Sequence, residues 1–223
     1  MNSKNLVIVI IVVLLLGALG WYSKSKNELA VVNTDTEVQN TLKIAESQKA
    51  LSVSNTESEA TYEIDEKLQG KPVRVVGKNK GVEGSVVIDS NTKNIIKATV
   101  LLDANGFVTD IAKRDENVKS LVLKSNQELN KYITFTTTKI EGFPTNLENN
   151  TEYTAKVTGD LTISGVTKEV PFDAILKYSD DGSLTVNAKT QLTYEDFGIV
   201  VPNLPFLSDV SKVVDLHMVL IAR

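Results

Sequence analysis

The side chains that most often do chemistry in proteins are scarce in this sequence. It has one histidine, His217, and no cysteine, so thiolates and imidazoles cannot assemble into a zinc site. It also lacks the Gly-x-Ser-x-Gly motif of hydrolase nucleophiles and the glycine-rich loops that hold phosphates. His217 alternates with Asp215 and Val219, and the opposite side of that run carries Leu216 and Met218. The alternation predicts an exposed histidine on a strand.

Carboxylates are the abundant class of potential catalytic group. Asp110, Asp115, Asp160 and Asp196 could serve a two-carboxylate hydrolase. Asp115 directly follows Arg114, which favours a helix-end cap or an ion pair. Asp160 and Asp196 fall where turns or exposed strand positions are expected. Because the spacing brings no convergent set together, we expect a protein that is not an enzyme and holds no metal or cofactor.

The elements that must position any site are strands. Residues 153–176 read YTAKVTGDLTISGVTKEVPFDAIL, with apolar side chains at alternate positions and a break at Ser164-Gly165. This pattern predicts a β-hairpin with one apolar face.

The same alternation recurs in other parts of the chain. It appears at residues 82–88, 96–102, 133–137, 184–192 and 214–220, and a further strand is expected at 73–76. Together these runs give about eight strands, a number that commonly closes into a small barrel. We therefore expect a mainly β protein, an antiparallel barrel with an apolar inner face and an outer face in water.

One stretch between these strands loses the period of two. Residues 110–120 have helix-forming side chains at three- and four-residue spacings, which predicts a short helix. Asn105-Gly106, just before it, is compatible with either a loop or a hairpin turn. Asp180-Asp181-Gly182 is a clearer hairpin signal between two strands.

Several groups of residues resemble the YceI-like domain family. They are Arg114-Asp115 before the short helix, Phe135 in the strand that follows, Gly159 to Thr167 (GDLTISGVT), and Asp196-Phe197-Gly198 before the last hairpin. They follow the family's order and spacing over about residues 60–223. The resemblance implies a lipocalin-like antiparallel β-barrel, exported in bacteria, whose elongated interior can hold a long isoprenoid lipid. It also favours a loop and a short helix across one end of the barrel.

The inward residues of the predicted strands are the candidate ligand-binding residues. They are Phe135, Leu161, Ile163, Phe172, Leu192, Leu216 and Met218. The same alternation describes a barrel filled by its own side chains, so it does not distinguish a cavity from a packed core. Two functions therefore remain open. One is a carrier that holds an isoprenoid or a similar amphiphilic lipid, and the other is a structural or protein-interaction module of the bacterial envelope without a ligand.

The N-terminal residues, 1–26, predict a membrane anchor or a signal segment. The apolar run from Leu6 to Tyr22 has about 17 residues, the lower limit for a transmembrane helix. Trp21 and Tyr22 would lie in an aromatic belt, which favours a retained anchor. Ala18-Leu19-Gly20 instead resembles a signal-peptide cleavage site. Either way, we expect the barrel outside the cytoplasm, held at the cell membrane or, after cleavage, secreted or periplasmic.

The remaining features concern the linker, the barrel domain and their partners. Residues 27–59 are rich in Asn, Thr, Ser, Glu and Gln and predict a polar linker, with a short amphipathic stalk helix as the alternative. The barrel domain is then 60–223, and without cysteine its core must supply its stability. A net charge of -4 with scattered lysines argues against a nucleic-acid partner. An exposed barrel edge or the anchor could support a homodimer.

Overall fold

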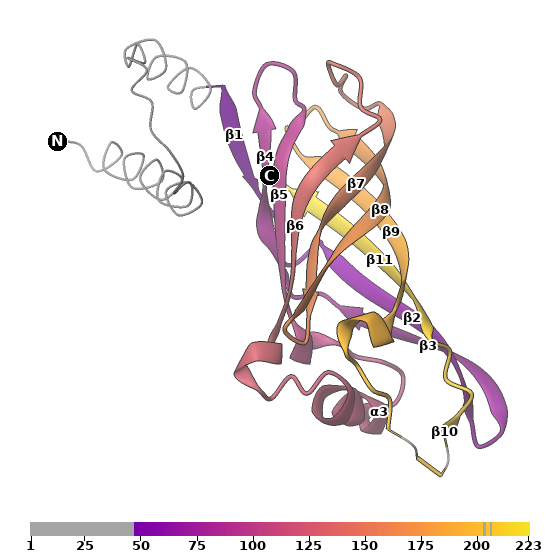
Figure 1. The fold of residues 1–223 in the computed structure, drawn as a ribbon. Coiled ribbons are helices and arrows are strands. Elements are labelled where there is room, and N and C mark those ends of the chain that lie inside the picture. The colour runs from indigo at the N-terminus through magenta and orange to yellow at the C-terminus, as the bar shows by residue number, and fades with distance from the viewer. Residues whose placement is uncertain (1–46, 203, 206) are drawn as a thin grey trace, which may run out of the picture. The chain divides into compact units, whose positions relative to one another are not determined.

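Antiparallel strands make up most of the described part of the molecule (Figure 1). The structure is a computed structural model and describes residues 47–223 apart from 203 and 206. The strands are β1 (Gln48–Ser52), β2 (Glu59–Leu68), β3 (Lys71–Asn79), β4 (Val82–Asp89), β5 (Ile95–Asp103), β6 (Tyr132–Glu141), β7 (Glu152–Ile163), β8 (Val166–Tyr178), β9 (Leu184–Thr193), β10 (Leu207–Ser208) and β11 (Val213–Ala222). A short helix, α3 (Ala112–Asn117), continues into a π-helical turn, Val118–Val122. Short 3₁₀ segments lie at Ala104–Gly106, Glu128–Asn130 and Tyr194–Phe197.

The strands form one curled sheet in the order β1-β4-β5-β6-β7-β8-β9-β11-β2-β10, with β3 beside β2. The sheet curls far enough for the last residue of β1 and the residues after it to reach the end of β11. There the Ser52 amide donates to the Arg223 carbonyl at 2.7 Å and the Ser54 amide donates to the Ile221 carbonyl at 2.8 Å. Because this seam is short, the architecture is an antiparallel half-barrel.

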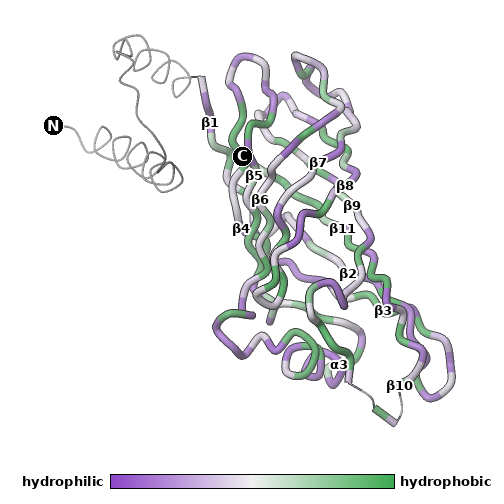
Figure 2. The backbone as a smooth tube through the Cα atoms, viewed as in Figure 1, coloured by the Kyte–Doolittle hydropathy of each residue, from purple (hydrophilic) through white to green (hydrophobic). Residues whose placement is uncertain are grey.

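The buried apolar side chains of the strands form one core cluster, so the apolar face of each strand lies on the inside of the curl. Hydrophobic and hydrophilic residues follow one another along the strands in Figure 2. The hairpin predicted at residues 153–176 is confirmed, because Ala155 pairs with Ala174 and Val157 with Phe172 across β7 and β8. Its turn uses Ser164 and Gly165, with φ of 50° and 76°. Two adjacent positive φ values suit the twist of a two-residue hairpin and explain the glycine.

The half-barrel contains three strands beyond the number that the alternation predicts. The additional strands are β1, β2 and β10. β2 escapes detection because its inner side includes a carboxylate, Glu66, beside Tyr62 and Ile64, so the apolar alternation breaks. β1 lies inside the range 27–59 that the composition predicts as a linker, so the sheet begins before residue 60. Its pairing with β4, from Gln48 opposite Asp89 to Ser52 opposite Ser85, explains how so polar a segment becomes a strand.

The lower end of the half-barrel in Figure 1 is covered by the segment between β5 and β6, which contains α3. The loop and short helix expected there are confirmed, with helical residues at 112–122 where 110–120 were predicted. Asp115 holds the entry to the helix by accepting hydrogen bonds from the amide and the hydroxyl of Thr109, at 2.9 and 2.7 Å. This agrees with a structural role for Asp115.

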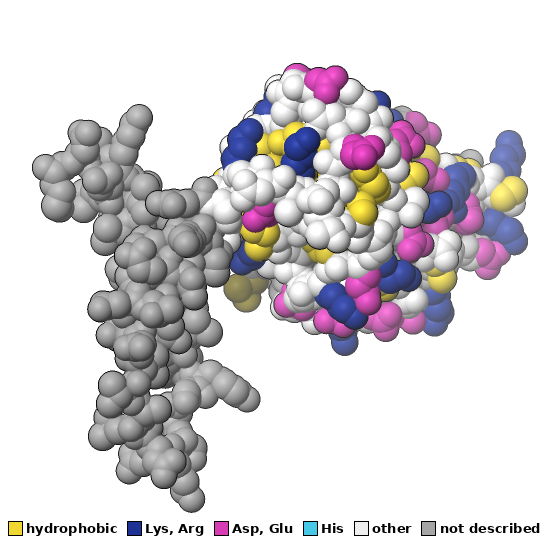
Figure 3. All heavy atoms as spheres, turned by 90° about the horizontal axis from the view of Figure 1, so that it is seen from above, with side chains coloured by type: hydrophobic (Ala, Val, Ile, Leu, Met, Phe, Trp, Pro, Cys, Tyr) yellow, Lys and Arg dark blue, Asp and Glu magenta, His cyan; other side chains and the backbone are white. Residues whose placement is uncertain are grey.

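The opposite end carries the turns that join β4 to β5, β6 to β7 and β8 to β9 (Figure 1). The hairpin predicted at Asp180-Asp181-Gly182 is among them, with Gly182 at φ 83°. Seen from above, this end is mainly polar, and its hydrophobic side chains form small separate groups among charged ones (Figure 3).

No helix within the described residues is long and apolar enough to cross a membrane. The apolar run from Leu6 to Tyr22 and most of the predicted linker lie outside the described residues.

Candidate functional site

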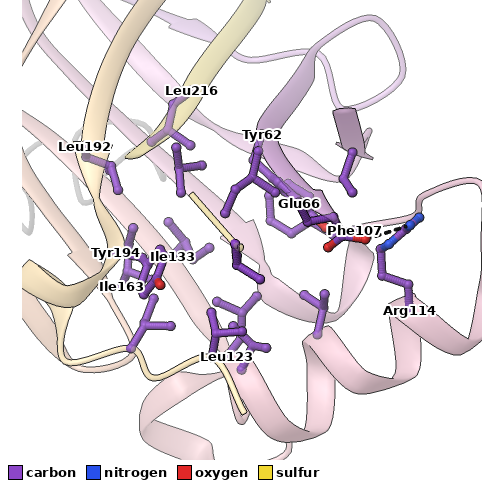
Figure 4. A pocket seen from close by; sticks show the side chains of 18 residues that line it. Tyr62, Glu66, Phe107, Arg114, Leu123, Ile133, Ile163, Leu192, Tyr194 and Leu216 are labelled. Carbon is purple, nitrogen blue, oxygen red and sulfur yellow. Dashed lines mark hydrogen bonds and ion pairs between the residues drawn. The ribbon is translucent and has the colours of Figure 1, made fainter. Parts of the chain in front are cut away.

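The half-barrel encloses an apolar cavity of about 170 Å³ at the end covered by α3 (Figure 4). Strands supply Tyr62, Ile163 and Leu216 to its wall, and the covering segments supply Phe107 and Leu123. The sheet therefore forms one side of this cavity and the loops close the other.

Two smaller cavities, of about 80 and 40 Å³, are also enclosed by the sheet. The first and second cavities share Phe107, Ile133, Ile163 and Leu216 in their walls. The second and third share Val100, Phe135, Phe172 and Met218. Side chains that belong to two cavities are the partitions between them. The interior is thus a row of apolar compartments separated by side chains.

All the ligand-binding residues predicted from the sequence line this row. Ile163, Leu192 and Leu216 border the first compartment, and Phe135, Leu161, Phe172 and Met218 border the second. Phe135, Phe172 and Met218 also border the third. The strand alternation therefore placed these side chains together, while their contact with a ligand stays a prediction.

An aromatic pair forms the partition between the second and third compartments. The rings of Phe135 on β6 and Phe172 on β8 meet edge to face, with centroids 5.1 Å apart and planes at 74°. β7 lies between β6 and β8, and the contact between the two rings is possible because β7 carries Gly159 at this point. A Cβ atom built at Gly159 would lie 2.5 Å from Cζ of Phe135, so the missing side chain provides the space for the ring.

A buried ion pair lies at the edge of the first compartment. Arg114 of α3 donates to the carboxylate of Glu66 on β2 at 3.2 Å, and the two side chains are 12% and 9% exposed. Arg114 also pairs with Asp110, whose side chain is exposed. Burial of a charged pair in apolar surroundings is costly unless each charge is matched. The pair therefore fixes α3 over the open end of the sheet and adds a polar group to an otherwise apolar wall.

Tyr62 stands beside this pair (Figure 4). Its ring packs over Gly77 of the neighbouring strand, because a Cβ atom there would lie 2.1 Å from Cε1 of Tyr62. The ring also meets Phe107 edge to face at 5.3 Å. Burial raises the pKa of the Tyr62 phenol to about 12, so the hydroxyl stays protonated at neutral pH.

Tyr62, Glu66 and Arg114 are not among the residues that the sequence predicts for the site. The signal for Tyr62 was present, because Ala60, Tyr62 and Ile64 alternate in the same way as the predicted strands. Glu66 and Arg114 are separated by 48 positions, and their contact depends on α3 folding back over β2. No local pattern carries that information.

The residues considered for catalysis do not converge into a site. Asp110 and Asp115 are engaged in the contacts described above, and Asp160, Asp196 and His217 are exposed. The exposed strand position predicted for His217 is confirmed. Within the described residues, no group of three or more His, Asp or Glu side chains could hold a metal ion. A larger hollow of about 830 Å³, which includes His217, is lined by exposed polar side chains such as Lys156 and Lys189 together with apolar residues such as Ile175.

The fold and the site define a class of protein, namely an antiparallel half-barrel with a partitioned apolar interior. The chain belongs to the YceI-like domain family, whose model matches residues 51–222. This confirms the resemblance inferred from the sequence motifs.

Bacterial relatives agree with this assignment. A UPF0312 protein of Pectobacterium atrosepticum is 27% identical over 137 residues, which cover 59% of this chain and 67% of that protein. A UPF0312 protein of Pseudomonas putida is 32% identical over 136 residues, which cover 56% of this chain and 64% of that protein.

Solved structures share the fold at lower identity. A polyisoprenoid-binding domain from Saccharophagus degradans, implicated in plant cell wall breakdown, superposes with a TM-score of 0.63 at 16% identity and covers 78% of this chain and 97% of that chain. BcnA from Burkholderia cenocepacia superposes with a TM-score of 0.55 at 17% identity, covering 77% of this chain and 99% of that chain.

Proposed function

We propose that this protein binds a long-chain isoprenoid or a similar amphiphilic lipid inside the half-barrel. The observation that carries the proposal is the row of apolar compartments inside the half-barrel. The fold shared with a domain described as polyisoprenoid-binding supports the same ligand class. The half-barrel would then work as lipocalin-like barrels do, with the ligand inside the curl of the sheet.

The polarity of the interior suggests how such a ligand lies. The buried pair of Arg114 and Glu66, with the Tyr62 phenol nearby, gives hydrogen-bonding groups at the α3 end. The deeper compartments are almost wholly apolar. The head group therefore lies at the α3 end and the chain extends towards Phe135 and Phe172. Each buried CH2 group contributes about 0.8 kcal/mol before ordering costs are subtracted.

The compartments are small for this ligand, and their partitions must move to admit it. Pockets for drug-sized ligands typically hold about 300–1,000 Å³, whereas the first compartment holds about 170 Å³. Rotation of partition side chains such as Phe107 and Leu216 would join neighbouring compartments. In this proposal, contacts of these side chains with the lipid replace their contacts with one another.

A second function follows from the same packing. The contact between Phe135 and Phe172, together with the small volume of the deepest compartment, suits an interior that remains filled by its own side chains. In that case the protein is a structural or protein-interaction module of the bacterial envelope. It binds no lipid in the interior, and its function depends on its outer surface.

The proposal also includes a location. We place the half-barrel outside the cytoplasm, tethered to the membrane through the segment from Leu6 to Tyr22, because this run is apolar and ends in an aromatic pair. Cleavage near Ala18-Leu19-Gly20 would instead release it. Labelling of an introduced cysteine by a membrane-impermeant reagent in intact cells tests the location, and labelling only after cell lysis would contradict it.

Two substitutions on β11 separate the carrier from the structural module. Leu216 borders the first two compartments, so Leu216→Trp should occupy the space that a lipid needs. His217 is the next residue and is exposed, so His217→Trp adds the same ring on the outer side. The full chain and both variants are purified from a bacterial host, and their organic extracts are examined by mass spectrometry.

A prenyl lipid that accompanies the unaltered chain and His217→Trp, but falls at least tenfold in Leu216→Trp, supports the carrier. Urea unfolding of all three proteins serves as the control for folding. If the unaltered chain carries no lipid and takes up none on incubation with prenyl lipids, the carrier proposal fails and the structural module is favoured.

A further inference from the structure

The end of the half-barrel covered by α3 exposes large apolar side chains. Leu121, Leu129 and Val200 are 42%, 86% and 73% exposed. We call these residues the end patch. Soluble proteins often expose single apolar residues, so exposure by itself decides little. The end patch is of interest because it lies at the same end of the half-barrel as the first compartment.

The segments that carry Leu121 and Val200 also form the wall of that compartment. Ile199 and Val201 border the cavity, so Val200 between them points outward. Val122 and Leu123 likewise border it, and Leu121 precedes them. The segments around Leu121 and Val200 therefore carry apolar side chains on both sides, towards the cavity and towards the solvent.

Two lysines flank Leu121 of the end patch. Lys119 and Lys124 lie on either side of Leu121, and neither has an ion-pair partner among residues 47–223 as far as the structure describes them. Among the nearby carboxylates, Glu116 pairs with Lys113 at 2.8 Å and Asp110 pairs with Arg114, while Glu128 is exposed directly before Leu129. Residues 110–131 carry five basic and four acidic side chains, a small positive excess on a chain whose net charge is -4.

We propose that the end patch docks on the surface of an anionic lipid bilayer. Exposed leucines beside unpaired lysines are the combination that inserts into the interface of such a membrane, because the apolar side chains enter it and the lysines face the anionic head groups. A second copy of the chain is a poorer occupant, since a two-fold contact would bring the same lysines together. The proposal stands apart from lipid binding in the interior, because a self-filled half-barrel could dock in the same way.

The absence of cysteine in the sequence permits an experiment with a unique label. Asn126→Cys places an environment-sensitive fluorophore such as NBD on the exposed segment between Leu121 and Leu129. Asn146→Cys is the matched control, an exposed asparagine beyond the far end of β6, a strand of 10 residues or about 33 Å. The full chain carries each label, so any contribution of the N-terminal residues to vesicle association is the same in both.

The labelled proteins are titrated with phosphatidylcholine vesicles that contain or lack phosphatidylglycerol. We expect the emission of the 126 label to shift to the blue with the anionic vesicles and the 146 label to stay unchanged. Combining Lys119→Gln and Lys124→Gln should weaken the response about 25-fold. Combining Leu121→Ser and Leu129→Ser should remove the shift while circular dichroism stays the same.

Two outcomes overturn the proposal. In the first, the 126 label responds no more than the 146 label at any lipid concentration. In the second, the 126 label shifts without vesicles and in proportion to protein concentration, which would identify a second copy as the occupant.

Discussion

At the scale of single residues, the interior combines an apolar wall with a few buried polar groups whose partners come from distant parts of the chain. Glu66 is held by Arg114, and the Tyr62 ring lies over Gly77. Replacing one member of a buried ion pair leaves an unmatched charge, whereas an apolar pair of similar volume can be neutral. The ion pair is therefore better explained by its position at the cavity than by stability.

The buried phenol of Tyr62 predicts a dependence of stability on alkaline pH. Its pKa rises from 10 to about 12 on folding because burial disfavours the phenolate. Below pH 10 the phenol is protonated in both states and has no effect. Between pH 10 and 12 the unfolded state loses the proton first, so the free energy of unfolding should fall by roughly 2 kcal/mol. Urea denaturation at several pH values measures this fall.

Tyr62→Phe is the control for that titration, since the lysines of the chain also ionise in this range. Tyr62→Phe should lack the part of the fall in unfolding free energy that arises from the phenol. Its stability relative to the unaltered chain should therefore improve as the pH rises. Identical pH profiles for both proteins would show that the phenol is not buried as described.

At the scale of elements, glycines determine how closely neighbouring strands and rings approach. Gly77 and Gly159 each leave room for an aromatic ring from the adjacent strand, Tyr62 and Phe135 respectively. This arrangement directs both rings across the inner face. The partitions of the interior thus depend on two positions that have no side chain.

Gly159→Ala should be destabilising because the new methyl group would lie 2.5 Å from both the Phe135 ring and the Thr136 carbonyl oxygen. Such overpacking typically costs about 1–3 kcal/mol. Urea unfolding measures the loss. Combining Gly159→Ala with Phe135→Leu should recover the part that arises from the ring, so the two effects should be less than additive. Strict additivity would contradict the proposed contact.

At the scale of the whole molecule, the half-barrel depends on the short seam between residues 52–54 and the end of β11. The backbone bonds of Ser52 and Ser54 to β11 bring the first and last strands together. Arg223 also donates to the carboxylate of Glu57 at 2.9 Å next to this seam. Long-range closure of this kind joins residues separated by most of the domain.

Ser54→Pro tests the seam because proline has no amide to donate to Ile221. Ser54→Ala is the matched control, since it keeps the amide and loses only the side-chain bonds to Thr56 and Glu57. The proline variant should be less stable than the alanine variant by about 1–2 kcal/mol. Urea unfolding and hydrogen exchange of the neighbouring amides measure the difference. Equal stability would mean that the seam does not contribute to closure.

The alternation of side chains predicted most strands and the residues that line the interior. Phe135, Leu161 and Leu216 were placed on the inner face by period alone, because successive side chains of a strand point to opposite faces in any sheet. β2 was missed because its inner face includes Glu66, whose partner is far away in sequence. β1 was missed because its polar residues form a strand only through pairing with β4.

The antiparallel β class, the inner face of most strands and membership of the family can be read from the sequence, since each of these depends on residue type and local spacing. The division of the interior into compartments and the contacts of its buried polar groups arise only in the tertiary structure. A partition such as Phe135 with Phe172, or a pair such as Glu66 with Arg114, forms only when separate strands and a helix meet. The volume left between the side chains depends on every group that surrounds it, so it is fixed only when the whole fold has formed.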